Sequence, residues 1–230
     1  MVAVTNNVPT LFSVDVPTGQ RTPVKSPLGD GTSINAIGYN TIDNRLYGVQ
    51  NKNPPRIIRI GSDGAIAAVK DLPITPSGGG YNTGDVDYNG NFWVAYNGRD
   101  WVEINLASNT IVASGTATLP FSIYDWSYVP NGGAFLYAIS VDARGATFLM
   151  RFSLITHVWS QVGTGYGTIY PSNGVVGAIY ASQDGFLYSS ENSEGKIYKL
   201  SLDGKTSTFI STGPRATSND GAHCVLNSVF

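Results

Sequence analysis

The chain has 230 residues, of which 13% are charged, and a formal net charge of −2. This length suits one well-buried domain, and the low charge leaves no basic stripe that could neutralise nucleic-acid phosphates. The sequence contains no apolar run long enough to span a bilayer and no lipidation motif, so we expect no membrane insertion. Its 27 glycines and 12 prolines predict many tight turns and few helices.

The first predicted elements belong to a repeat that is split between the two ends of the chain. Val2 to Val4 has the pattern of a remaining second strand, and Thr10–Val14 and Gln20–Val24 have the pattern of an outer hairpin. The missing first strand is expected at Asn219–Val225. A composite blade of residues 219–230 plus 2–25 would close a ring and leave no exposed sheet edge.

Four complete copies of the same unit lie between these ends. Each copy has four short β-type runs separated by turn residues, and the clearest copy ends in a strand that alternates apolar and polar residues before an Asp-Gly hairpin turn. Four antiparallel strands repeated at a regular spacing predict propeller blades. We expect these blades at about residues 34–70, 83–114, 123–162 and 176–211.

The spacing of the copies supports this interpretation. The residues that close the first strands are separated by 49, 40, 52 and 44 positions, close to the roughly 40 to 50 residues of propeller repeats; they are Tyr39, Tyr88, Tyr128, Tyr180 and Cys224. The sequence therefore predicts an all-β fold, a single five-bladed β-propeller domain in which the N-terminal strands pair with the C-terminal strand. A β-sandwich is the alternative, but it requires neither a repeated four-strand unit nor a half-unit at each end.

Several runs resemble known propeller repeats. Asp43–Gly48 and Asp184–Tyr188, each followed by a hairpin that turns at Asp-Gly, resemble NHL and YVTN-like repeats. More narrowly, Leu11–Asp15 with Ile34–Asn40 and the closing Asn219–Ala222 resemble an uncharacterised family of secreted or surface-displayed propeller domains in fungi and bacteria. This resemblance covers nearly the whole chain and implies the fold and an extracellular setting, but no activity.

The N-terminus and the single cysteine also bear on the compartment. The opening MVAVTNNVPT lacks a charged leader and a long apolar core, so it is not an intact signal peptide, and we expect the leader of a secreted parent to lie outside this sequence. Cys224 has no internal partner. It is either a packed small apolar residue or the partner of an upstream cysteine in a longer protein.

Loops on one face of the predicted ring are suited to binding. The segments that lead into the innermost strands are long and rich in Gly, Ser, Thr, Asn and Tyr; they are Asp71–Thr83, Gly163–Gly174 and Gly213–Ser218. The loops between second and third strands share this face. Such loops on a rigid scaffold are where binding residues usually lie.

Carboxylates recur near the start of the innermost strands. Asp85, Asp125 and Asp220 would converge from three blades on one channel mouth, where carboxyl groups could act as acid and base in glycoside hydrolysis. The alternative, which the residues favour, is that these aspartates accept hydrogen bonds from backbone N–H groups and hold the ring together. We expect no cofactor and no metal site, although a cation held in the central channel is left open.

Aromatic and polar side chains on the loop face suit a sugar, whose C–H face stacks on rings while its hydroxyls form hydrogen bonds. Trp101 beside Arg99 is the best surface candidate, and the alternative is that such rings fill gaps between blades. The predicted ligand-binding residues are Asn35, Asp87, Arg99, Trp101, Tyr124 and His223.

The sequence thus predicts an extracellular recognition module, lectin-like, that binds a glycan or another cell-surface polymer through the long-loop face. One alternative is a small secreted glycan-cleaving enzyme, a glycoside hydrolase or polysaccharide lyase, with Asp85, Asp125 and Asp220 as catalytic residues. A further alternative is a protein-interaction scaffold.

Overall fold

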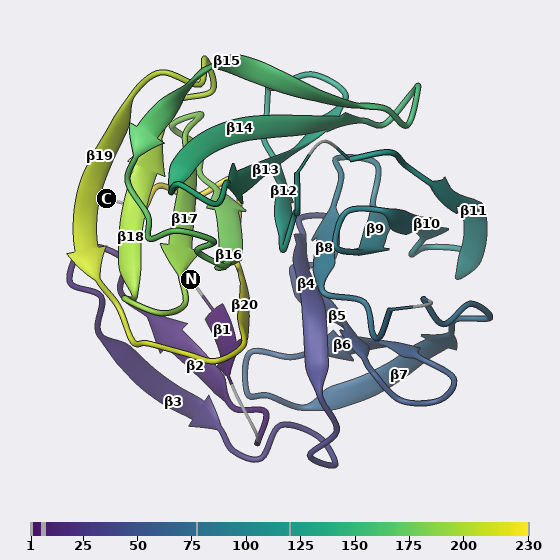
Figure 1. Ribbon diagram of the computed structural model, residues 1–230. Coiled ribbons are helices and arrows are strands. Elements are labelled where there is room, and N and C mark those ends of the chain that lie inside the picture. Colours follow the sequence, from purple (N-terminus) through teal and green to yellow (C-terminus); the bar gives the residue numbers. More distant parts are fainter. Residues whose placement is uncertain (1, 6–7, 77, 120, 230) are drawn as a thin grey trace.

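The alternating runs and the turns between them form twenty short strands and no helix in the part of the chain that the structure describes, residues 2–5, 8–76, 78–119 and 121–229. The structure is a computed structural model, shown in Figure 1. The strands form sheets arranged around a central axis, so the predicted all-β propeller is confirmed. The described part contains no helix that is long and apolar enough to cross a membrane.

Four sheets are built from consecutive strands, and every neighbouring pair is antiparallel. Their strands are β4 (Ile34–Asn40), β5 (Arg45–Gln50), β6 (Arg56–Ile60) and β7 (Ile66–Asp71); β8 (Thr83–Val86), β9 (Asn91–Tyr96), β10 (Asp100–Asn105) and β11 (Thr110–Thr116); β12 (Trp126–Tyr128), β13 (Phe135–Val141), β14 (Ala146–Ser153) and β15 (Trp159–Thr168); and β16 (Val176–Ala181), β17 (Leu187–Glu191), β18 (Lys196–Leu200) and β19 (Ser207–Thr212). These sheets correspond to the four blades predicted between the ends of the chain.

A smaller composite sheet joins the two ends. Its order is β20-β1-β2-β3, with β20 (Asn219–Ala222), β1 (Val2–Thr5), β2 (Leu11–Val14) and β3 (Arg21–Lys25). Strand β1 pairs antiparallel with both β20 and β2, as expected. The ring therefore consists of four blades of consecutive strands plus this small sheet, rather than five blades of one kind.

The innermost strands β4, β8, β12, β16 and β20 contact one another in cyclic order around the axis, with β20 contacting β4. Apolar side chains fill the spaces between successive sheets. Trp93 of β9 packs with Trp126 of β12 and Phe152 of β14, and all three are buried. Buried polar side chains also occur within these sheets, for example Ser189 and Glu191 of β17.

Three boundaries differ from the sequence-based expectation. Strand β8 ends at Val86, because Asp87 Oδ1 accepts hydrogen bonds from the backbone N–H groups of Asn89 and Asn91 and forms a tight turn. Strand β20 ends at Ala222, three residues early, where the chain turns. Strand β15 continues to Thr168, past an irregularity in its pairing with β14, so half of the expected loop at 163–174 is strand.

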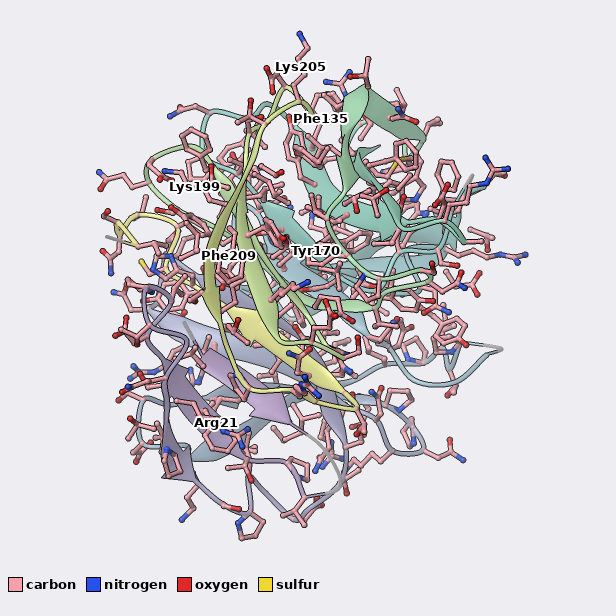
Figure 2. All side chains as sticks on the ribbon, turned by 60° about the vertical axis from the view of Figure 1, so that its left-hand side comes forward. Arg21, Phe135, Tyr170, Lys199, Lys205 and Phe209 are labelled. Carbon is pink, nitrogen blue, oxygen red and sulfur yellow. The ribbon has the colours of Figure 1, made fainter. Side chains whose placement is uncertain are left out.

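Figure 2 views the molecule from the side of β18 and β19. Phe209 and Lys199 lie on this outer part of the blade, and Lys205 lies at the turn between the two strands. Lys205 and many other nitrogen-bearing side chains extend outward around the outline of the molecule.

Candidate functional site

The predicted catalytic carboxylates join neighbouring sheets. Asp125 directly precedes β12, and its Oδ1 accepts the backbone N–H of Trp126 at 2.8 Å. Its Oδ2 accepts the N–H of Ile179, in β16 of the next sheet, at 2.6 Å. The side chain therefore connects its own strand to the following innermost strand.

Asp220 makes the same connection elsewhere in the ring. Its Oδ1 accepts the N–H of Gly221 at 2.6 Å, and its Oδ2 accepts the N–H of Ile37 in β4 at 2.8 Å. Asn35 is the corresponding residue of β4. Its Oδ1 accepts the N–H of the next residue, Ala36, at 2.8 Å, as the aspartates do within their own strands.

Asp85 is bonded on both sides. Its Oδ1 accepts the N–H of Val86 at 2.8 Å and, more weakly, that of Tyr39 in β4 at 3.4 Å. Its Oδ2 accepts the N–H of Tyr128 at 2.8 Å and the hydroxyl of Ser127 at 2.9 Å, both in β12. We call this carboxylate-to-next-strand bond, made by Asp85, Asp125 and Asp220, the inter-blade clasp.

The three clasp carboxyls are buried, with Asp125 and Asp220 at 0% exposure. Burial raises the pKa of Asp85 to about 7, although its four donors act in the opposite direction. Burial, reinforced by the charge of Asp220, raises the pKa of Asp125 well above its usual range. Burial and the charge of Asp85 do the same to the pKa of Asp220.

The expected position of these residues at an open channel mouth is therefore corrected. Asp125 and Asp220 expose no surface that a substrate could reach, and each of their oxygens already accepts a hydrogen bond from a backbone N–H. Strong perturbation of pKa is common at catalytic sites, but it also accompanies structural networks. The geometry here is that of a network that holds strands together.

On the loop face, two adjoining cavities surround the start of β10 and the end of β11. One, of about 270 Å³, is lined by residues that include Tyr81, Trp101 and Gly115. The other, of about 320 Å³, is lined by residues that include Arg99. Thr116 lines both. We call the pair of cavities the Trp101 groove.

Trp101 does not lie on the surface as expected. Its ring is 5% exposed, and it packs against Trp93, Phe152 and His157, with the His157 ring centroid 4.2 Å away. Most of the side chain therefore fills a gap between blades, which is the alternative that the sequence analysis gave for such rings. Its indole edge, however, faces Gly115 in the wall of the groove.

The indole N–H groups of the four tryptophans differ in their partners. The N–H of Trp93 donates to Asp87 Oδ2, that of Trp126 to the carbonyl of Trp93, and that of Trp159 to the carbonyl of Gly98. No hydrogen-bond acceptor for the N–H of Trp101 occurs among the described residues. This donor is therefore free for a ligand in the groove.

Further polar groups surround this donor. Arg99 is exposed, and Asp100 Oδ1 accepts the hydroxyl of Thr116 at 2.9 Å across the β10–β11 pair. The hydroxyl of Tyr81 is occupied, because it donates to the carbonyl of Ile74 at 3.0 Å. The groove thus offers a guanidinium, a carboxylate, a hydroxyl and an indole N–H, a combination that can hydrogen-bond a polyhydroxylated ligand.

The remaining predicted ligand residues are not brought into this groove. Asn35 and Tyr124 are half-buried near the start of their innermost strands. Asp87 and His223 lie at the opposite ends of such strands; Asp87 is buried in its turn, and His223 Nδ1 lies 3.2 Å from the carbonyl of Ala181. Burial lowers the pKa of His223.

The sequence did not single out Gly115 and Thr116. They become groove residues because the pairing of β10 with β11 sets Gly115 opposite Trp101 and Thr116 opposite Asp100. An irregularity between Glu103 and Ile104 sets this register, which the sequence pattern alone does not predict. Within the described residues, no group of three or more His, Cys, Asp or Glu is placed to hold a metal ion.

Comparison with known proteins identifies the repeat but not a function. A family model described as a repeat of unknown function, DUF6923, matches residues 2–226. No curated protein matches the chain.

Solved structures share the fold at low sequence identity. Virginiamycin B lyase from Staphylococcus aureus is 18% identical, with a TM-score of 0.53 over 89% of this chain and 63% of that one. A putative gluconolactonase is 15% identical, with a TM-score of 0.57 over 93% and 73%. A chain of the nidogen/laminin complex is 8% identical, with a TM-score of 0.61 over 97% and 81%. The chain spans less than two thirds of the length of the lyase, and at these identities the likeness shows the fold alone.

Proposed function

We propose that this chain, which belongs to the DUF6923 repeat family, is a recognition module that binds carbohydrate through the Trp101 groove. The observation that carries the proposal is the indole N–H of Trp101, which lies at a groove wall without an acceptor among the described residues, while the other three tryptophans all donate. Trp101 Nε1 is not among the buried polar atoms that lack a partner, so it is open to the groove, where a ligand hydroxyl could take the place of water.

The groove favours a sugar over an apolar ligand. Arg99, Asp100 and Thr116 supply donors and acceptors within a few residues of Trp101. Since the face of Trp101 is covered by its neighbours, the indole would contribute a directional hydrogen bond rather than stacking. A glycan of a cell-surface polymer is the partner we propose, and the family resemblance supports an extracellular setting.

A second candidate is a glycan-cleaving enzyme that uses Asp85, Asp125 and Asp220. Its support is that the similar structures include proteins named a lyase and a gluconolactonase, and that burial perturbs the pKa values of all three carboxyls. Access is the argument against it, because substrate would have to open the inter-blade clasps. We favour binding, and we further propose that the composite sheet serves as the fifth blade that closes this ring.

A glycan array on the purified protein tests the proposal, with Arg99→Ala and Arg21→Ala as a matched pair. Arg99 lines the groove, whereas Arg21 lies on the outer strand β3 over the ring of Phe12. We expect a specific oligosaccharide to bind the wild type and the Arg21→Ala protein equally, and the Arg99→Ala protein about tenfold more weakly, the effect of losing one charged hydrogen bond. An array with no bound sugar would refute carbohydrate recognition.

Asp125→Asn separates the two candidates. An enzyme that relies on this carboxyl would lose turnover of a polysaccharide while still binding it. A binding module would show no turnover in either form and unchanged affinity, provided that circular dichroism confirms the fold of the variant.

A further inference from the structure

A separate cavity lies on the face that carries the turns between innermost and second strands. Its volume is about 280 Å³, and residues from three blades and from the segment after β20 line it; the ones used below are Asp87, Tyr88, Tyr128, Val225 and Leu226. No residue of the Trp101 groove is among its lining residues, so the two sites are independent.

Two tyrosine rings from neighbouring blades, those of Tyr88 and Tyr128, lie side by side in the lining of this cavity. Their centroids are 5.9 Å apart and their planes are inclined by 36°. Tyr88 is 63% exposed although it is a large ring, whereas Tyr128 is 9% exposed. The exposed side chain of Leu226 and the buried Val225 add an apolar wall. An exposed ring beside an apolar wall is a surface that a ligand would cover.

The charge at this cavity is negative. Asp87 lies in its lining, and its carboxylate is held by the N–H groups of Asn89 and Asn91 and by the indole of Trp93, all of which are uncharged. These donors fix the carboxylate without neutralising it. No Lys, Arg or His occurs in the lining among the described residues.

The negative charge of Asp87 also affects the pKa values of two neighbouring side chains. Burial, and to a smaller extent the charge of Asp87, raises the pKa of Tyr128. Burial and the charge of Asp87 also raise the pKa of Glu103. In both cases burial is the larger cause of the shift, and the charge of Asp87 adds to it.

We propose that this cavity binds a small organic cation, a quaternary or methylated ammonium group. The negative faces of two tyrosine rings attract such a cation within about 6 Å of a ring centroid. Its methyl groups suit the walls made by Val225 and Leu226, and it needs no hydrogen-bond acceptor. The carboxylate of Asp87 supplies the counter-charge.

A metal ion suits the cavity poorly. Both oxygens of Asp87 already accept protein hydrogen bonds, and no further carboxylate or imidazole lines the cavity among the described residues. A hard cation requires several oxygen ligands in direct contact. A bulky, weakly hydrated cation does not, so the cavity selects for it.

The test is a titration of the protein with choline and, separately, with 3,3-dimethyl-1-butanol, the uncharged molecule of the same shape, followed by NMR chemical shifts. We expect choline to bind at millimolar concentration with shifts at Tyr88 and Tyr128, and the neutral isostere to bind at least tenfold more weakly. Equal binding of the two molecules, or no binding of choline at tens of millimolar, would overturn the proposal.

Three variants locate the site. Tyr88→Leu should weaken choline binding about tenfold, and Tyr88→Phe should retain it, because the ring and not the hydroxyl attracts the cation. Phe209→Leu is the control, since Phe209 is an exposed ring on the outer strand β19 (Figure 2), and it should bind like the wild type. Because Tyr88 is exposed, its replacement leaves the core intact; loss of binding in the Phe209 variant as well would contradict the assignment.

Discussion

The backbone N–H of Ile179 donates to the carboxylate of Asp125 at 2.6 Å, across the boundary between the sheets that contain β12 and β16. The same relationship joins Asp85 to Tyr128 and Asp220 to Ile37. The inter-blade clasps therefore connect the innermost strands at three of the boundaries around the axis. They stabilise the ring that positions the Trp101 groove.

Removal of one clasp should destabilise the protein. Asp125→Ala leaves the buried N–H groups of Trp126 and Ile179 without acceptors, so we expect the free energy of unfolding to fall by about 2 to 5 kcal/mol. Urea denaturation followed by tryptophan fluorescence measures this loss. Asp63→Ala, at an exposed turn whose carboxylate accepts the N–H of Ala65, is the control and should cost less than about 1 kcal/mol. Equal effects would argue against the clasp.

Stability should decrease as the pH rises from about 4 to 7. The pKa of Asp85 is about 7 in the folded protein, against 3.8 ordinarily, so the folded state binds more protons than the unfolded state between these values. The stabilisation is complete below pH 3.8 and is lost as the pH rises through 7. For Asp85 alone it is on the order of 4 kcal/mol.

Urea midpoints at pH 4, 5.5 and 8 test this dependence. The raised pKa values of Asp125 and Asp220 act in the same direction. Asp85→Asn should flatten the profile, because the amide does not titrate. A wild-type midpoint that increases steadily from pH 4 to 8 would contradict the assignment.

The close approach of β4 and β8 should not tolerate a methyl group. A Cβ added at Gly38 would lie 2.6 Å from the Cα of Asp85 and 2.8 Å from its Oδ1. Since backbone atoms cannot rotate away, Gly38→Ala should cost about 2 kcal/mol or more. Gly213→Ala, whose nearest contact is the side chain of Ile197 at 3.2 Å, should cost clearly less in a parallel thermal melt. The reverse order would be inconsistent with this packing.

The two ends of the chain should unfold together. Strand β1 lies between β20 and β2. A variant that begins at Val8 lacks β1, so β20 and β2 each lose the strand with which they pair on that side. We expect a lower melting temperature and fast amide exchange at Asp220–Ala222, measured by hydrogen–deuterium exchange. Unchanged protection of β20 in the shortened protein would show that β1 is dispensable.

The sequence predicted most of the architecture because turn chemistry and alternation are local signals. The Asp-Gly turns marked hairpins, and the spacing of Tyr39, Tyr88, Tyr128 and Tyr180 marked the innermost strands. The composite sheet followed from half-units at both ends. The local pattern did not predict where a strand ends when a side chain accepts hydrogen bonds from the backbone that follows it. Asp87 does this after β8.

The site was less predictable for a related reason. The sequence marks Asp85 and Asp125 as residues near the start of the innermost strands. The pattern of residue types does not reveal whether such a carboxylate faces solvent or the N–H of a neighbouring blade. Trp101 was identified as a candidate, yet its burial depends on rings from the next sheet that are distant in sequence, such as Phe152. Its partners Gly115 and Thr116 depend on a strand register, which a single-residue irregularity changes.

The most direct test of carbohydrate recognition is an NMR titration that follows the four tryptophan indole N–H resonances while oligosaccharide is added. Three of these protons are held by protein acceptors, and that of Trp101 is not. We predict that a bound sugar shifts the Trp101 resonance downfield and leaves those of Trp93, Trp126 and Trp159 nearly unchanged. A bound oligosaccharide that leaves the Trp101 resonance in place would contradict this account.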